Sequence, residues 1–300
     1  MLFNTSNIEI TKIHDKIFSE KELSLDVVRL DKIHPVVSGN KLFKLHYFLE
    51  RATQLNQHTI VTYGGAYSNH ICATAYTCNL LGLKSIGIIR GENFAQLSHT
   101  LQFCKDNGME LIFNSRQLYT QKNHSDYHET IEKNFGDCAV IPEGGFHALG
   151  AQGAATILQT FDSGKYDYII CDIGTATTIA GILSAANANQ KIIGVPVLKG
   201  MIDIYQRINR IVRANTNQLT ILDNYHFGGY AKKTSELISF MNTLYRQNQV
   251  PTDFVYTGKQ IFAIFDAAKN DFFKRGSKIA CLHNGGLQGN LSLPKGTLIF

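Results

Sequence analysis

The strongest constraint on the fold is the alternation of short apolar runs with longer runs of helical periodicity. Strand-like runs at 59–63, 85–89 and 110–113 alternate with helix-like runs at 71–81 and 97–107. Short runs rich in β-branched residues favour strands, and apolar residues at every third or fourth position favour helices. Strands separated by helices form parallel sheets that are covered on both faces. The sequence therefore predicts an α/β fold.

The same alternation is found in the rest of the chain. Helices are predicted at 154–161, 179–186, 236–244 and 258–272, and strands at 25–30, 139–141, 168–172, 191–197, 218–222 and 278–282. The polar stretch 114–126 predicts no element. The glycine-rich stretch 143–153 is interpreted as a crossing between two sub-domains, the middle one inserted into the larger.

Composition narrows the class of protein. The 300 residues are 44% apolar and 18% charged, as in an ordinary globular protein, and the net charge of +5 comes without a basic run. Nucleic-acid binding is therefore not indicated. The six cysteines form no Cys-x-x-Cys pair, so neither a disulfide framework nor a metal site is expected. Residues 1–5 lack the features of a signal peptide and no apolar run reaches membrane-spanning length, so the cytosol is the expected compartment.

A first candidate site lies at residues 38–45. Asn40 is a candidate N-cap, and Leu42, Leu45 and Leu49 then share one helical face. Lys41 would lie in the first turn, where the helix dipole disfavours an ammonium and lowers its pKa. Such an amine suits Schiff-base formation with a carbonyl cofactor, although most lysines in first turns are surface residues.

A second candidate site lies at residues 63–70. The pair Gly64 and Gly65 permits close approach of the backbone, and Ser68 and Asn69 can cap the helix that follows. Exposed N–H groups at such a helix start can bind an anion such as a carboxylate.

A third candidate site follows the strand at 168–172. The turn Gly174, Thr175, Ala176, Thr177 and Thr178 precedes an apolar helix, where unpaired N–H groups and hydroxyls can hold a phosphate. The absence of a Gly-Lys-Thr ending and of Gly-x-Gly-x-x-Gly disfavours nucleotide triphosphates and dinucleotides. Seen alone, the turn could also be a simple helix cap.

These motifs occur in a recognisable order with two others. The sequences IHPVVSGNK at 33–41, GGAYSNH at 64–70, IPEGG at 141–145, GTATT at 174–178 and VYTGK at 255–259 together resemble the family of pyridoxal-phosphate (PLP) enzymes containing D-cysteine desulfhydrase and 1-aminocyclopropane-1-carboxylate deaminase. The resemblance implies PLP fold type II, with two open, twisted, mostly parallel sheets. It also implies a larger phosphate-binding domain (1–39 and 148–300), a smaller domain (40–147) and a homodimer.

The resemblance also implies roles for single residues. Lys41 would form the Schiff base and act as the base at the substrate's α-carbon, and Asn40 would contact the ring hydroxyl. The turn 174–178 would hold the phosphate. Ser68, Asn69 and His70 would bind the substrate carboxylate. Catalysis would involve Ser68, Tyr230 and Tyr256, and Thr257 would meet the ring nitrogen. The roles of His147 and His283 are left open.

Three departures from the family pattern affect this interpretation. Many relatives have glycine at the position of Ala176, so a positive φ there would require a differently shaped loop. Some desulfhydrases have threonine where Asn284 stands, and residues 28–31 also differ. The deaminase branch holds a glutamate where Thr257 stands.

The neutral Thr257 hydroxyl decides between the activities that the resemblance implies. It cannot supply the charge of a glutamate, so the ring would be a weaker electron sink. A weak sink suffices for β-elimination of a thiolate, and opening a cyclopropane ring should require more. We therefore expect a lyase that converts D-cysteine to pyruvate, ammonia and hydrogen sulfide. The alternatives are a 1-aminocyclopropane-1-carboxylate deaminase and a catalytically silent PLP-binding protein.

Overall fold

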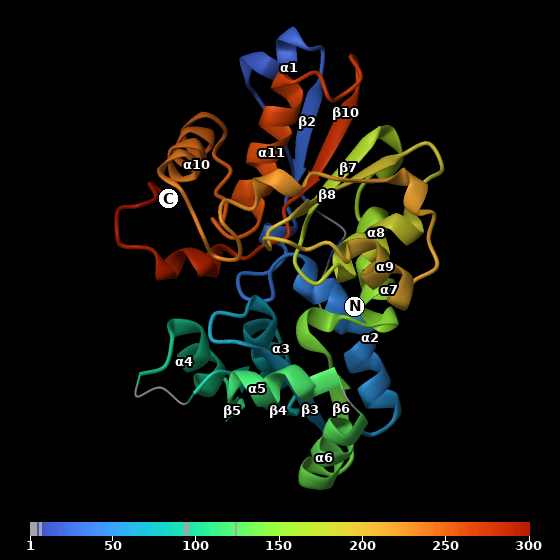
Figure 1. Cartoon of the computed structure of the whole chain (residues 1–300), viewed down its shortest axis with the longest axis vertical. Coiled ribbons are helices and arrows are strands. Elements are labelled where there is room, and N and C mark those ends of the chain that lie inside the picture. The colour runs from blue at the N-terminus through green and yellow to red at the C-terminus, as the bar shows by residue number, and fades with distance from the viewer. Residues whose placement is uncertain (1–4, 6–7, 93–95, 124) are drawn as a thin grey trace.

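The structure is a computed structural model that describes residues 5, 8–92, 96–123 and 125–300 (Figure 1). Most of residues 1–5, on which the expectation about a signal peptide rests, lie outside the described residues. No helix in the described part of the chain is long and apolar enough to cross a membrane.

The larger sheet has six strands in the order β1-β2-β10-β7-β8-β9. They are β1 (Ile10–Ile13), β2 (Ser24–Val28), β10 (Lys278–Leu282), β7 (Tyr168–Ile173), β8 (Lys191–Pro196) and β9 (Leu219–Ile221). Only β1 pairs antiparallel, so the carboxyl ends of the other five strands share one edge.

Side chains that alternate along these strands enter two different cores. Ile170 packs with α1 (Lys16–Glu20), α10 (Ser235–Asn248) and α11 (Thr257–Lys269) on one face. Ile169 packs with α7 (Ala148–Ala155), α8 (Thr177–Ala185) and α9 (Ile204–Ile211) on the other. This period of two confirms helices on both faces, as the alternation of the sequence predicts.

The smaller sheet is entirely parallel, with the strand order β5-β4-β3-β6. Its strands are β5 (Glu110–Asn114), β4 (Lys84–Arg90), β3 (Thr59–Gly65) and β6 (Cys138–Ile141), and its helices are α2 (Asn40–Gln54), α3 (Asn69–Leu80), α4 (His99–Asp106), α5 (Arg116–Thr120) and α6 (Ser125–Phe135). On β4, Ile86 and Ile88 face Tyr119 of α5 and Ile131 of α6, whereas Ile89 faces α3 and α4.

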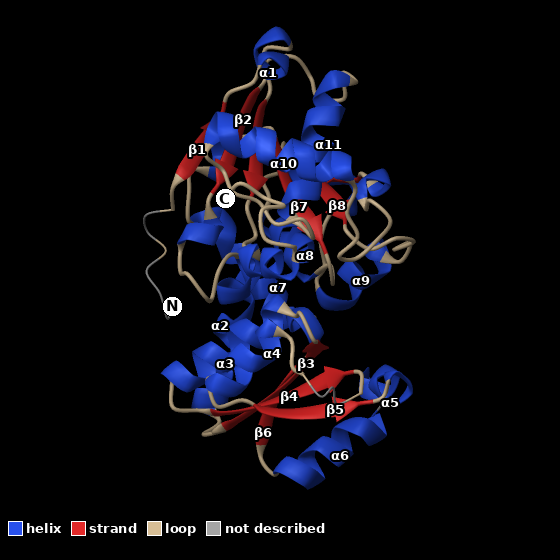
Figure 2. Cartoon of the chain, turned by 90° about the vertical axis from the view of Figure 1, so that its left-hand side faces the viewer, coloured by secondary structure: helices blue, strands red, loops and turns tan. Residues whose placement is uncertain are grey.

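The two sheets lie at opposite ends of the molecule, with α2 and α7 between them (Figure 2). The two helices touch closely at Gly153, where a Cβ would come within 1.9 Å of the Phe43 carbonyl oxygen. Only glycine permits this approach. The stretch interpreted as a crossing therefore contains α7, whose glycines allow a helix to pack there. The domain boundaries near residues 40 and 147 stay a prediction.

Other elements differ from the sequence-based expectations. The polar stretch 114–126 contains α5 and the start of α6, and β1, α1 and α9 were not expected. Short 3-10 helices occupy Leu30–Lys32, Gln121–Asn123, Glu143–Gly145, Thr156–Gln159, Ser163–Lys165, Thr216–Gln218, Asp223–Tyr225 and Leu287–Ser292.

Candidate active site

A cavity of about 650 Å³ lies where the starts of three helices, α2, α3 and α8, come together. Its lining includes all the candidate site residues except one, namely Asn40, Lys41, Ser68, Asn69, His70, Gly174, Thr175, Ala176, Thr177, Thr178, Tyr230 and Tyr256. The exception is Thr257. Segments that lie up to about two hundred residues apart in the sequence therefore share one site.

Asn40 links the lysine to the third candidate site. Its Nδ2 donates a hydrogen bond to Thr178 Oγ1 (2.8 Å), and its Oδ1 accepts one from Lys41 Nζ (2.5 Å). The prediction that Asn40 caps α2 was wrong, because the helix begins at Asn40 and Gly39 occupies the N-cap position with φ 67°. The amide is thereby free to face the cavity.

Gly39 sets the position of this helix start. A Cβ on Gly39 would lie 2.0 Å from the carbonyl oxygen of Asn284, so the segment before Lys41 rests directly on the loop after β10. The positive φ and the close approach both require glycine.

The amine of Lys41 lies in a cavity that lowers its basicity. Burial lowers the pKa of Lys41, while the carboxylates of Asp172 and Asp253 act in the opposite direction. Lys44, one turn further along α2, lines the same cavity, and burial together with the charge of Lys41 places its pKa well below the usual value. A lowered pKa increases the fraction of neutral, nucleophilic amine.

The turn before α8 is shaped for an anion. Ala176 occupies the N-cap position with φ 73° and ψ 1°, and no side chain caps the helix. The turn therefore takes the left-handed conformation with a residue other than glycine, which costs about 1 kcal/mol. The first N–H groups of α8 are left for a ligand at the positive end of the helix dipole.

Ser68 caps α3, as predicted, since its Oγ accepts a hydrogen bond from Ile71 N (3.3 Å). The ring of His70 makes a hydrogen bond within the protein through Nε2, and its Nδ1 has no partner among the described residues. The Thr62 hydroxyl donates to Ile141 O (2.8 Å), so it accepts from Nε2 of His70 (2.9 Å). Burial places the pKa of His70 well below its usual value, so the ring is neutral.

Tyr230 and Tyr256 form a pair at the cavity wall. Tyr256 Oη donates to Tyr230 Oη over 3.4 Å, and the two rings meet edge to face with centroids 6.0 Å apart. Burial raises the pKa of both hydroxyls. Both are therefore neutral at physiological pH and can donate a proton or a hydrogen bond.

Thr257 lies at the start of α11, behind Tyr256. Its side chain is buried outside the cavity lining, and its hydroxyl has no hydrogen-bond partner among the described residues. Its backbone N–H donates to Asp253 Oδ2 (3.0 Å), while Oδ1 of the same carboxylate accepts from Val255 N (2.9 Å) and Tyr256 N (2.7 Å). Asp253 thus fixes the start of the helix that carries both site residues.

Several residues that line the cavity were not found from the sequence as site residues, namely Lys44, Arg90, Glu143, Asp172, Leu198 and Arg207. The position of Asp172, at the carboxyl end of a strand directly before a predicted phosphate turn, is a signal that could have found it. Ligands in open α/β sheets bind beyond the carboxyl ends of the strands.

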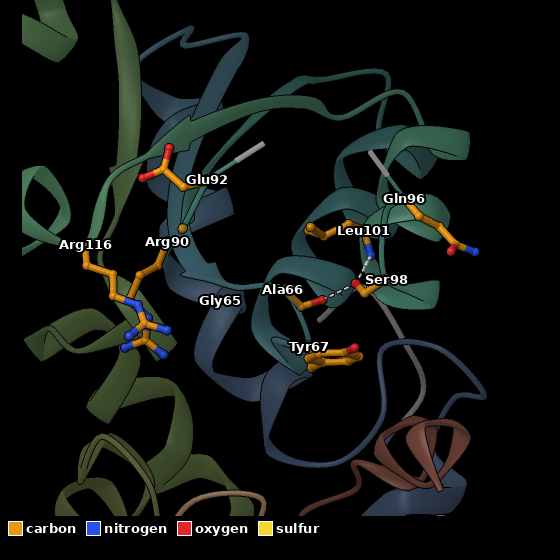
Figure 3. Close-up of a pocket in the computed structure, with 10 residues that line it drawn as sticks. Gly65, Ala66, Tyr67, Arg90, Glu92, Gln96, Ser98, Leu101 and Arg116 are labelled. Carbon is orange, nitrogen blue, oxygen red and sulfur yellow. Dashed lines mark hydrogen bonds between the residues drawn. The ribbon is translucent and has the colours of Figure 1, made fainter. Parts of the chain in front are cut away.

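A second cavity of about 910 Å³ shares a wall with the first, formed by residues 65–67 and Arg90 (Figure 3). Ser98, the N-cap of α4, donates from its hydroxyl to the Ala66 carbonyl and accepts from Leu101 N (3.1 Å). This bond ties α4 to the second candidate site.

The two histidines of open role both make structural hydrogen bonds outside the cavity lining. His147 Nδ1 accepts from Leu149 N (3.1 Å) and caps α7. His283 is buried, and its Nε2 lies 2.8 Å from Pro251 O. Within the described ranges, no three His, Cys, Asp or Glu side chains group in a way that could hold a metal ion.

A half-buried lysine with a lowered pKa and an uncapped helix start on one cavity define an α/β enzyme site for a phosphorylated carbonyl cofactor. The family model for pyridoxal-phosphate dependent enzymes matches residues 11–285, so the chain belongs to that family.

Proteins of known name align with most of this chain. A putative 1-aminocyclopropane-1-carboxylate deaminase of Thermotoga maritima is 30% identical, with 91% of this chain and 92% of the relative covered. A D-cysteine desulfhydrase of Serratia proteamaculans is 27% identical, with 86% of each covered. The solved structure of an ACC deaminase homologue has a TM-score of 0.81 at 24% identity and covers 96% of this chain and 92% of its own, which confirms the fold. The chain is therefore a PLP-dependent lyase of the group that contains these deaminases and desulfhydrases.

Proposed function

We propose that the chain is a PLP-dependent lyase that converts D-cysteine and water to pyruvate, ammonia and hydrogen sulfide. One observation carries the proposal. Lys41 lines the same cavity as the turn 174–178 and the loop 65–70. Cofactor attachment, phosphate binding and substrate carboxylate binding can therefore occur in one site.

The residues present fit the cofactor. Lys41 supplies the amine for its aldehyde, and the uncapped N–H groups of α8 suit its phosphate. Lys44 places a second amine on the same cavity wall. Asn40, which contacts both Lys41 and Thr178, would contact the ring hydroxyl. When bound, PLP supplies an electron-withdrawing ring that makes the substrate's α-proton acidic.

The remaining residues are proposed to handle the substrate. The backbone N–H groups at the start of α3, among them those of Asn69 and His70, would bind its carboxylate together with the side chains of Ser68 and Asn69. Lys41, whose pKa is lowered by burial, would take the α-proton as a neutral amine. Tyr230 and Tyr256 are protonated, which suits orientation of the substrate and transfer of protons.

D-cysteine is favoured because a thiolate leaves readily once the α-proton has been removed. Thr257 is proposed to meet the ring nitrogen, since its buried hydroxyl has no hydrogen-bond partner among the described residues. A neutral hydroxyl there would leave the ring a weaker electron sink, which suffices for this elimination. A second candidate substrate, 1-aminocyclopropane-1-carboxylate, is favoured by Asp172, a carboxylate on the cavity wall that could strengthen the electron sink.

The test is a substrate panel on the cofactor-loaded chain. We expect sulfide and pyruvate from D-cysteine, less from L-cysteine, and little ammonia from the cyclopropane amino acid. Ammonia from the cyclopropane substrate alone would replace the first proposal by the second. A chain that binds PLP but turns over none of the three would support a catalytically silent binding protein.

We further propose that the chain works as a homodimer in the cytosol. The described cysteines are buried and form no disulfide, which suits a reducing compartment. Sedimentation of the loaded protein would give the subunit number, and a monomer would contradict the proposal.

A further inference from the structure

Lys259 is a fully buried lysine in the first turn of α11, outside the cavity lining. Its Nζ donates hydrogen bonds to the carbonyl oxygens of His226 and Gly229, each over 2.8 Å. No carboxylate oxygen of a described residue lies within 4.0 Å of this nitrogen. The lysine is therefore bonded to two carbonyls of one short loop.

Packing alone does not account for a lysine at this position. Burial lowers the pKa of Lys259 to about 8, so most of the side chain is still charged at neutral pH. Removing a charge from water is costly unless hydrogen bonds compensate for it. A methionine has a similar length and would fill the same space without this cost. The two hydrogen bonds are therefore expected to serve the loop that accepts them.

This loop, residues 226–231, is called the tyrosine loop below. Phe227 and Ala231 adopt positive φ angles of 50° and 53°, and Gly228 and Gly229 between them have φ angles of 93° and 121°. Residues other than glycine adopt this conformation at a cost in free energy. A loop with such a backbone depends on contacts from other elements to keep its shape.

The tyrosine loop places Tyr230 in the cavity lining, where its Oη accepts the hydrogen bond from Tyr256 Oη (3.4 Å). Tyr256 is the N-cap residue of α11, and Lys259 lies three residues further on. Phe262, in the next turn, packs edge to face on Phe227 of the loop, with ring centroids 5.0 Å apart. The start of α11 therefore carries one tyrosine directly and contacts the loop of the other at two points.

We propose that Lys259 is a positioning residue that holds Tyr230 at the cavity beside Tyr256. The inference rests on the role of Tyr230 in the proposed function and deepens it. A group that transfers a proton must lie within hydrogen-bond reach of its partner. Without the two bonds from Lys259, the loop would open in part of the molecules and carry the Tyr230 hydroxyl out of reach.

The first experiment needs no cofactor. Lys232 and Lys233 directly follow the tyrosine loop and are exposed, so trypsin can cut the chain after them. Lys259→Met should raise the rate of cutting there at least about tenfold, because cutting follows the population of the open loop. Lys269→Met, at the exposed end of the same helix, is the matched control and should leave the rate unchanged. Mass spectrometry of the fragments identifies the bonds that are cut.

Two results of this experiment would overturn the inference. One is an unchanged rate of cutting after Lys232 and Lys233 in Lys259→Met. The other is an equal acceleration at exposed lysines throughout the chain, since this would indicate a general loss of stability and no specific effect on the loop.

The second experiment is a double-mutant cycle on the PLP-loaded chain, with a substrate of the panel that it turns over. Lys259→Met should lower kcat at least about tenfold and leave the affinity for PLP within about twofold of the native value. In the Tyr230→Phe background the same change should have little further effect on kcat, because the hydroxyl that it positions is already absent. Additive losses would mean that Lys259 acts elsewhere and would contradict the inference.

Lys259→Gln separates the hydrogen bonds from the packing. Glutamine keeps two N–H donors on a side chain that is one bond shorter, so this variant should lie between the native chain and Lys259→Met in both measurements. A glutamine variant that is no better than the methionine variant would contradict the inference. If Lys259→Met does not fold, Lys259→Gln is compared with the native chain, and equal cutting and equal kcat in the two would count against it.

Failure here is distinguishable from failure of the proposed function. If the native chain binds PLP and turns over a substrate while Lys259→Met matches it in kcat and in cutting by trypsin, only the role of Lys259 is lost. If no PLP binds or no substrate is turned over, the proposed function fails, and the cutting experiment still decides whether Lys259 holds the tyrosine loop.

Discussion

Asn40 donates a hydrogen bond to Thr178 across the cavity, over 2.8 Å from Nδ2 to Oγ1. The contact joins the first residue of α2 to the second residue of α8. Asn40→Ala would leave the buried hydroxyl of Thr178 with one partner fewer and release Lys41. We expect an unfolding free energy lower by roughly 1–2 kcal/mol and PLP affinity at least about tenfold weaker. Urea unfolding and cofactor titration measure both. Asn79→Ala, at an exposed amide, is the control and should change neither.

Lys41 should carry the cofactor. Borohydride reduction of the loaded chain should fix PLP to the peptide that contains Lys41, as fragment-ion mass spectrometry can show. Lys41→Ala should lose the label and lower kcat by about 10³-fold or more, because both attachment and the base are removed. Lys44→Ala is the matched control, one turn along the same helix, and should keep the label. A label on Lys44 in the native chain would overturn the assignment.

The left-handed conformation of Ala176 predicts a stabilising substitution. Ala176→Gly should raise the unfolding free energy by about 1 kcal/mol, because glycine adopts φ 73° without strain. Ala180→Gly, in the interior of the same helix, should lower it by about 1 kcal/mol. Thermal and urea unfolding of the pair measure the contrast. Equal effects of the two changes would argue against strain in the turn.

Ser68 is expected to act in both stability and binding. Ser68→Ala should cost about 1 kcal/mol through loss of the α3 cap, and it should also raise KM. Ser115→Ala removes the equivalent cap of α5, whose Oγ accepts from Leu118 N (3.2 Å), and lies outside the cavity lining. It should cost a similar free energy and leave KM unchanged. A normal KM in the Ser68 variant would contradict its role in carboxylate binding.

Asp253 predicts a pH dependence of stability. Burial raises its pKa in the folded chain to about 6, well above the ordinary value for an aspartate. The folded state therefore binds a proton more tightly, and the contribution of this group to stability grows as pH falls through 6. Between pH 8 and pH 5 the gain is about 1 kcal/mol. Urea unfolding at both values should show this gain in the native chain relative to Asp253→Asn. A smaller gain in the native chain than in the variant would contradict the assignment.

The sequence predicted the sheets better than the site. Buried parallel strands such as β7 and β10 are near-continuous apolar runs, so their bounds could be predicted within about a residue. The elements missed were short or polar. In α5, Tyr119 is the residue that packs in the core, so the helix has little apolar periodicity. The glycines of α7 argue against a helix in the sequence, although its packing against α2 requires them.

Local sequence motifs were enough to predict most of the site residues that line the cavity. The hydrogen bonds between residues far apart in the sequence could not be predicted. The hydrogen bond from Asn284 to Asp172 depends on β10 adding beside β7, which no local pattern specifies. The same holds for Asn40, which was expected to cap its own helix. A short-range rule favoured the cap, and a contact with Thr178, 138 residues away, outweighed it.

The contact between Gly39 and the carbonyl of Asn284 has a consequence for biosynthesis. The segment that presents the reactive amine rests on a loop that is translated long after it. A polypeptide still emerging from the ribosome lacks that support, so Lys41 cannot adopt its working position until residue 284 has been made. Truncated chains that end before residue 284 should therefore be unable to bind PLP. Incomplete chains would then not present a reactive amine to aldehydes in the cell.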